Sequence, residues 1–103
     1  MGMTWSKHDD DVKDREAKAI EELDLLIWDQ TLSLSLDKVK NVVYTQSVGV
    51  KNLISAMKDR EADQIRKSRF FERNGVDDMR IFHNFNASRY NLAAFYLDIC
   101  YAV

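Results

Sequence analysis

Apolar residues in the first third of the chain recur every three or four positions, which is the spacing of one helical face. Val12, Ala19, Leu23 and Ile27 follow this period. Ser6 stands before a run of aspartates, and a serine followed by carboxylates is typical of a helix start. The pattern predicts a first helix that begins near Ser6 and carries one apolar face.

Between residues 30 and 50 the pattern fits two structures. Residues 32–36 alternate leucine with serine, and residues 42–45 are β-branched or aromatic, which is typical of strands. No Asn-Gly or Asp-Gly turn lies between them, and Val39, Val43 and Val50 also fit a helical face. Helix is the favoured interpretation. The alternative is an α+β fold with a short hairpin within residues 30–50.

The second half of the chain contains signals for two helix ends. One unbroken helix through residues 36–73 would be about 55 Å long, too long for a compact chain of this size. We therefore expect a break at residues 47–49. The next helix should end at Asn74-Gly75, residue types that accept the left-handed conformation, and Asp77 or Asp78 should cap the last helix. The expected fold is a small all-α bundle of three to four helices, in one domain spanning residues 1–103.

The last predicted helix is apolar on nearly all sides. From Leu92 to Val103 only Asp98 is polar by the composition count. Such a helix is either the centre of the bundle or has one side in an oligomer interface, where aromatic residues are enriched. A terminal helix seldom lies in the middle of a four-helix monomer, so we expect a homodimer through this helix. The predicted interface residues are Phe82, Phe85, Leu92, Phe95, Tyr96, Ile99 and Tyr101.

Composition indicates a folded helical protein with an uneven distribution of charge. Hydrophobic residues make up 46% of the chain and charged residues 31%, with no proline and three glycines. Ten acids accompany four bases up to Asp37, whereas eleven bases accompany seven acids from Lys38 onward. The simpler interpretation is that the acidic first helix lies against the basic remainder, within one chain or across a dimer. The alternative is that one half faces a charged partner.

The single cysteine, Cys100, excludes an internal disulfide and favours a reducing compartment. No run reaches the roughly 20 apolar residues of a membrane span, and the first residues lack the apolar core of a signal peptide. A cytoplasmic protein without membrane contact is therefore expected.

Two groups of residues suggest chemistry and have simpler explanations. Cys100 and His83 could form a thiol nucleophile and its base, but on one helix they would lie about 25 Å apart. Cys100 is therefore expected to be a buried structural thiol. The run His8-Asp9-Asp10-Asp11 contains metal-binding side chains, yet successive helical positions point about 100° apart, and the glycine turn of a calcium loop is missing. No enzymatic activity, metal, cofactor or small-molecule substrate is predicted.

Residues 65–73 combine basic with aromatic side chains. On a helix Arg66, Arg69 and Arg73 share one face, with Lys67 beside them, and this face could follow a phosphate backbone. Six bases accompany four acids in residues 58–73, however, which is typical of a solvated helix face. Phe70 and Phe71 are expected to be core residues rather than platforms for base stacking.

The favoured function is therefore a non-enzymatic helical protein–protein interaction module, a homodimeric regulator or inhibitor of a larger macromolecule. The alternative is a small nucleic-acid-binding regulator that uses the basic face Arg66–Arg73. Self-association without salt-dependent binding to DNA or RNA would distinguish the first function from the second.

Overall fold

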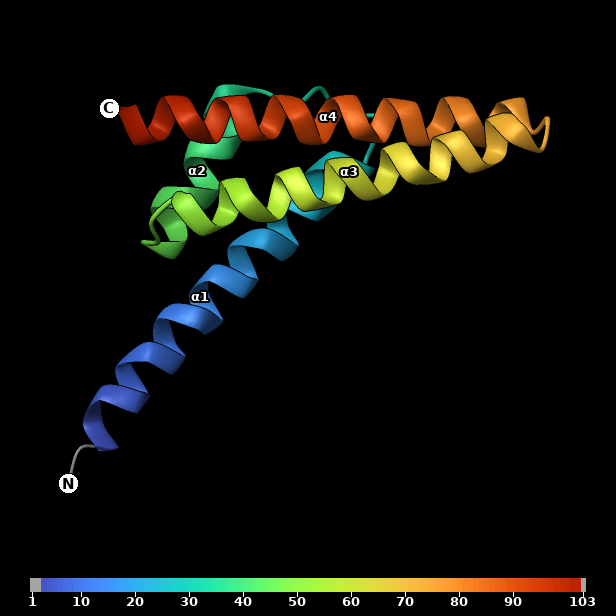
Figure 1. Ribbon diagram of the computed structural model, residues 1–103. Coiled ribbons are helices and arrows are strands. Elements are labelled where there is room, and N and C mark those ends of the chain that lie inside the picture. Colours follow the sequence, from blue (N-terminus) through green and yellow to red (C-terminus); the bar gives the residue numbers. More distant parts are fainter. Residues whose placement is uncertain (1–2, 103) are drawn as a thin grey trace.

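The computed structural model describes the backbone of residues 3–102 and the side chains of residues 10–101. Four helices follow one another, α1 (Met3–Trp28), α2 (Leu36–Gln46), α3 (Lys51–Arg73) and α4 (Asp77–Ala102) (Figure 1). No strand occurs within residues 3–102. The predicted all-α bundle is confirmed, and the hairpin alternative for residues 30–50 is wrong.

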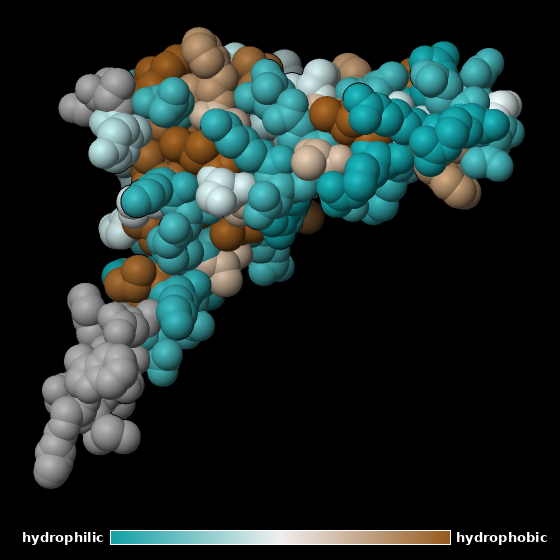
Figure 2. All heavy atoms as spheres, in the orientation of Figure 1, coloured by the Kyte–Doolittle hydropathy of each residue, from teal (hydrophilic) through white to brown (hydrophobic). Residues whose placement is uncertain are grey.

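Helices α3 and α4 form a long antiparallel hairpin, and α1 and α2 pack against the half of it farther from the α3–α4 turn (Figure 1). The other half projects beyond them, which makes the molecule elongated, with extents of 58, 30 and 22 Å. In Figure 2 the projecting end is mostly hydrophilic on the face shown, and the hydrophobic residues gather over the covered half.

The α3–α4 turn ends α3 as the sequence predicts. Gly75 has a φ of +71°, a conformation that glycine adopts without steric cost. The backbone N–H of Val76 donates to the carbonyl of Phe71, which satisfies one of the last carbonyls of α3. The predicted caps of α4 are shifted by one position, because Asp77 and Asp78 lie in its first turn rather than before it. Their carboxylates there still favour the helix dipole.

The alternation in residues 32–36 has a local explanation other than a strand. Leu34 is buried and anchors the α1–α2 connection, while the Ser35 hydroxyl accepts the backbone N–H of Lys38 and caps α2. Helix α2 then ends at Gln46, and its C-cap residue Ser47 takes the left-handed conformation with φ 54°. The predicted break at residues 47–49 is confirmed. Helix α1 begins at Met3, three residues before the predicted start at Ser6, because no proline or glycine separates the two.

The apolar core lies where all four helices meet. Helix α4 contacts α1, α2 and α3, as α1 contacts the other three, and the contact between α3 and α4 is the most extensive in the molecule. The sequence left two possibilities for this helix, a place in the bundle core or a place in an interface. Helix α4 has features of both, because it contributes residues to the core and still exposes large apolar side chains. The residues of this core are Ala19, Leu23, Ile27, Leu34, Val39, Val42, Val43, Val50, Leu53, Met57, Tyr90, Ala93, Ala94 and Leu97.

Candidate interaction surface

One face of α4 is turned away from the other three helices and carries a straight row of mostly apolar side chains. Its members recur at alternating spacings of four and three residues, which keeps them on one face for about 27 Å of helix. We call this row the α4 stripe. It consists of Ile81, Phe85, Ser88, Leu92, Phe95 and Ile99.

The side chains of the α4 stripe are largely open to solvent. Ile81 is 55% exposed, Phe85 44% and Phe95 58%, while Leu92 and Ile99 are half-buried. Single exposed hydrophobic residues are common on protein surfaces, whereas a contiguous row of them indicates a contact surface. The α4 stripe is therefore the strongest candidate for a binding surface in the described part of the chain.

At one edge of the α4 stripe, α4 is fixed to α1 by a buried arginine, Arg89. The Arg89 guanidinium donates hydrogen bonds to the carbonyl oxygens of Ile27 and Leu26, both at 2.7 Å, and of Asp29 at 3.2 Å. The carbonyls of Leu26 and Ile27 belong to the last turn of α1, where carbonyls lack partners within their own helix, whereas Asp29 lies just after α1 and its carbonyl also accepts the backbone N–H of Leu32. A positive charge there also complements the negative end of the helix dipole. Arg89 thus caps the C-terminal end of α1 and holds this end against α4.

A second set of polar contacts connects three helices beside Arg89. The Tyr90 hydroxyl donates to Asp24 at 2.8 Å and accepts the indole N–H of Trp28 at 2.8 Å. Asp24 also pairs with Arg60 of α3 at 2.9 Å. Burial raises the pKa of Tyr90 well above its ordinary value, and the hydrogen bond to the Asp24 carboxylate raises it further. The phenol therefore stays protonated and keeps donating to Asp24.

The pair Asp24–Arg60 is one contact between the acidic first helix and the more basic remainder. Two further contacts join these regions without an ion pair, because Gln46 donates to Glu22 and Asn52 donates to Glu16. These contacts agree with the simpler interpretation of the uneven charge distribution. A charged partner for one half is not required to explain them.

The projecting half of the hairpin is held together by polar side chains. Gln64 of α3 accepts hydrogen bonds from Asn86 at 3.3 Å and from the Nδ1 of His83 at 2.7 Å, in the tautomer that protonates this nitrogen. Ser68 donates to Asn84 at 2.8 Å. Gln30, from the α1–α2 connection, extends the network by donating to Asn86 at 2.9 Å. Every buried side-chain polar atom of the described residues has a partner.

His83 is buried in this layer and is not a base for Cys100. Its ring stacks on Phe71, with centroids 5.5 Å apart and planes 2° apart. Burial lowers the pKa of His83, and the nearby positive charge of Lys67 lowers it further. Cys100 lies on the same helix seventeen positions later and is half-buried, less than the full burial that its residue type predicts. Burial raises the pKa of its thiol, which disfavours the thiolate.

The basic face Arg66–Arg73 lies on the projecting half. Arg66, Lys67, Arg69 and Arg73 are all exposed. Arg66 and Lys67 both pair with Asp63, at 3.3 and 3.0 Å. These pairs offset part of the positive charge of the face.

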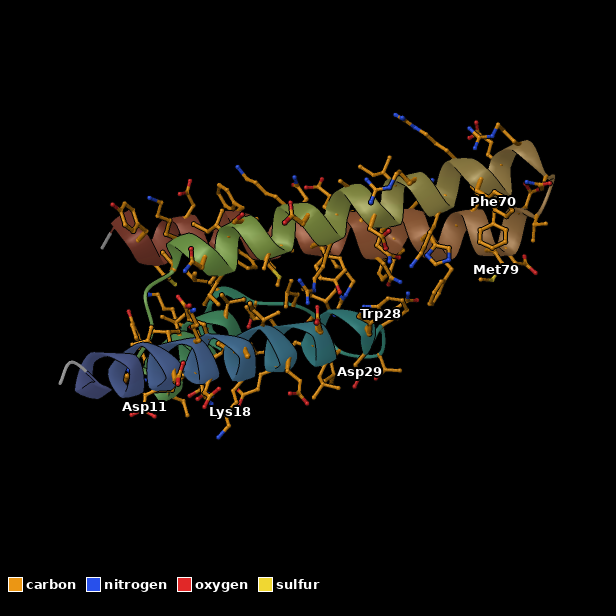
Figure 3. The ribbon with its side chains drawn as sticks, turned by 60° about the horizontal axis from the view of Figure 1, so that its bottom comes forward. Asp11, Lys18, Trp28, Asp29, Phe70 and Met79 are labelled. Carbon is orange, nitrogen blue, oxygen red and sulfur yellow. The ribbon has the colours of Figure 1, made fainter. Side chains whose placement is uncertain are left out.

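The expectation for the two phenylalanines of this segment holds only in part. Phe71 is half-buried against His83, but Phe70 is 52% exposed, so its assignment to the core is wrong. The reason is that α1 ends before this point and no third helix covers α3 here. Figure 3 places Trp28 and Asp29, at the end of α1, short of the hairpin end that carries Phe70 and Met79. A hollow of about 390 Å³ lies beside Phe70, lined also by Arg66, Lys67, Phe71 and His83.

The seven predicted interface residues do not form one surface. Phe85, Leu92, Phe95 and Ile99 belong to the α4 stripe. The other three lie beside it or elsewhere. Phe82 packs edge-on against Trp28 with centroids 5.5 Å apart, Tyr96 lies about 100° around the helix from Phe95, and Tyr101 lines a hollow beside the α2–α3 turn. Leu92, like Tyr96, also packs partly against the core. Ile81 was missing from the predicted set. Extending the three-and-four spacing back from Phe85 by one turn would have found it.

A second exposed apolar site lies where α1 meets α2. Leu25 and Leu32, 68% and 44% exposed, line a hollow of about 410 Å³ together with Leu26 and Val42. Glu22, Asp29, Lys38 and Asn41 complete its lining. This hollow is open and short, and polar residues interrupt it, so it offers a partner less continuous apolar contact than the α4 stripe.

No metal site follows from the described residues, since no three of their His, Cys, Asp and Glu side chains converge on one point. His8 and Asp9 lie outside the described side chains. Likewise, no helix within residues 3–102 combines the length and apolar character needed to cross a bilayer. Comparison of the chain with protein-family models, with curated proteins and with solved structures gave no match.

Proposed function

We propose that this protein is a non-enzymatic helical interaction module, which self-associates through the α4 stripe and regulates a larger macromolecule by binding to it. The observation that carries the proposal is the stripe itself, because three of its large apolar side chains are about half exposed on a helix that packs against the other three. Burying a large apolar side chain contributes about 1.5–3 kcal/mol. Several such residues in one row therefore favour association.

The polar clusters of the molecule support a role in binding rather than chemistry. Arg89 and Tyr90 are hydrogen-bonded to the end of α1, and His83 is hydrogen-bonded to Gln64 in the hairpin. Each of these groups has a structural partner at 2.7–2.8 Å. A general base or nucleophile must instead keep a free position directed at a substrate.

Nucleic-acid contact through Arg66–Arg73 is the second candidate, favoured by one observation. Phe70 is exposed beside Arg66 and Lys67, and an aromatic ring flanked by cations suits base stacking. Against it, residues 63–82 contain five bases and four acids, which gives little net attraction for phosphates. A fluorescent single-stranded oligonucleotide tests this candidate, which requires binding that weakens steeply with salt.

Sedimentation equilibrium over a hundredfold range of concentration tests the main proposal. The wild-type mass should rise from monomer to dimer, and Phe95→Lys should weaken association at least tenfold, since tenfold corresponds to about 1.4 kcal/mol and the substitution removes one large contact. Phe70→Lys is the matched control, because it places the same charge at an equally exposed phenylalanine outside the stripe. A wild-type protein that stays folded and monomeric at the highest concentration contradicts the proposal.

A further inference from the structure

The α4 stripe is nearly symmetric about its own centre. Residues at equal distances from position 90 are identical or complementary in size, in the pairs Ile81 and Ile99, Phe85 and Phe95, and Ser88 and Leu92. We propose that the partner of the stripe is α4 of a second copy of this chain, antiparallel to the first, with a twofold axis at position 90. This inference rests on the proposed function and specifies how the two chains pair.

In this arrangement, residues of the stripe whose numbers sum to 180 face each other, and the flanking residues on the α3 side pair where their numbers sum to 182. Phe85 meets Phe95 of the second copy, and isoleucine meets isoleucine at both ends. The small side chain of Ser88 leaves room for Leu92, so large and small side chains alternate across the contact. Spacings of four and three residues are those of antiparallel helices that interlock their side chains.

A parallel pairing of the same stripe is less favourable for two reasons. Each residue would face itself, which opposes Ser88 to Ser88 and leaves a gap in the middle of the contact. Asp78, one heptad before Phe85, would also face its own copy, which brings two carboxylates together. Antiparallel pairing avoids both and opposes the helix dipoles.

The edges of the stripe are compatible with the antiparallel pairing. On the α3 side, Asn84 comes near Asp98 of the second copy, so an amide can donate to a carboxylate. Asn91 meets its own copy across the axis. It donates one amide hydrogen to Glu61 at 3.2 Å, and its amide oxygen and other hydrogen remain for the second chain.

Arg89 lies on the other edge and does not repel its copy strongly. Its guanidinium is turned inward to the α1 carbonyls, at 2.7 Å from two of them, and the residue is only 8% exposed. The pairing therefore places no free like charges against each other along the stripe.

The area of the α4 stripe can be compared with that of known protein interfaces. A helix face about 27 Å long and about 10 Å wide covers a footprint of about 300 Å² per copy. Standard protein interfaces bury about 800 Å² of each partner. The stripe alone is smaller than a standard interface, so a weak, reversible dimer is expected.

Site-specific crosslinking tests the pairing, in a Cys100→Ser background that removes the native thiol. We would prepare Ile81→Cys, Ile99→Cys and Asn91→Cys, treat each with a short-spacer bismaleimide above the dissociation constant, and count covalent dimers on a denaturing gel. Mixed Ile81→Cys and Ile99→Cys should crosslink efficiently, whereas each alone should not, because like positions lie about 27 Å apart in the antiparallel pair. Asn91→Cys should crosslink to itself. Ser55→Cys, exposed on α3, is the control that reports random collisions.

The outcomes separate the pairing from the proposed function. Self-association of the wild type, together with Ile81→Cys that crosslinks to itself as well as the mixture does, overturns the antiparallel inference and leaves the interaction module in place. Self-association with crosslinking no greater than that of Ser55→Cys at every α4 position removes the stripe as the contact. Absence of self-association in sedimentation contradicts both proposals.

Discussion

The two halves of the α3–α4 hairpin are built from the same two helices and bury different chemistry. In the covered half, Leu53, Met57 and Leu97 are fully buried. In the projecting half, most of the buried positions between the helices are polar and joined by hydrogen bonds, namely Gln64, Ser68, His83 and Asn86. The difference lies in the number of neighbours, because α1 and α2 enclose the first half, whereas only the end of α1 and the residue Gln30 that follows it reach the second.

This comparison shows what two helices alone can exclude from water. A leucine between two helices that have no further neighbours remains partly exposed to solvent, so its burial contributes little free energy. A hydrogen-bonded pair needs only one neighbour on each side to be satisfied, and it fixes the register of the helices. The polar layer therefore keeps the projecting half paired where an apolar core cannot form.

Removing a side chain from the covered half should have the largest effect. Leu97→Ala leaves a cavity in the core, and such changes cost about 2–5 kcal/mol of unfolding free energy. Phe70→Ala removes a larger side chain from the projecting half and should cost less than about 1 kcal/mol, since Phe70 is half exposed. Urea unfolding followed by circular dichroism measures both. Equal losses would show that the two halves do not differ as described.

The contact that joins the covered half to α1 should come second. Arg89→Met keeps the aliphatic length of the side chain but removes the donors to Leu26, Ile27 and Asp29. Hydrogen bonds to charged groups contribute about 1.5–3 kcal/mol, so we expect a loss of about 2–3 kcal/mol in urea unfolding. Arg89→Lys, which keeps the charge without the planar fork, should recover part of this loss. If Arg89→Met kept the full unfolding free energy of the wild type, water would satisfy the carbonyls at the end of α1 as well as Arg89 does.

The smallest expected effect is a pH dependence in the projecting half. Burial and the charge of Lys67 hold the pKa of His83 below its ordinary value of 6.5. Between 6.5 and the lower folded pKa, the unfolded chain binds a proton that the folded chain does not, so the unfolding free energy falls as the pH drops through this range. Urea unfolding at pH 7 and pH 5 should show a smaller loss for His83→Gln than for the wild type. The same pH dependence in both would exclude His83 as its source.

Sequence patterns predicted the helices and their ends better than the surfaces. The helical spacing, the break at residues 47–49 and the end at Asn74-Gly75 depend on the conformational preferences of neighbouring residues. These preferences were sufficient to predict all three features. The exposure of Phe70 depends on where α1 stops relative to α3, which no local pattern contains. The same holds for Arg89, whose sequence context indicates an ordinary surface arginine, although it is buried against α1.

The candidate surface was predicted in part for the same reason. An apolar excess in α4 was visible in the sequence, but four of the seven chosen residues belong to the exposed stripe and three do not. Separating them requires the direction from which α1, α2 and α3 approach α4. Ile81, by contrast, could have been predicted as a stripe residue from helical spacing alone.

The hydrogen bonds of Arg89 also constrain the order in which the chain can reach its final form during synthesis. The carbonyls at the end of α1 leave the ribosome about 60 residues before the side chain that binds them, the separation being 60–63 positions. Until then the carbonyls of Leu26 and Ile27 lack the donor that satisfies them in the folded chain, whereas that of Asp29 has the nearby backbone N–H of Leu32. The first helix made is thus completed by the last, and a nascent chain halted before position 89 contains α1, α2 and α3 but lacks the part of α4 that closes the end of α1.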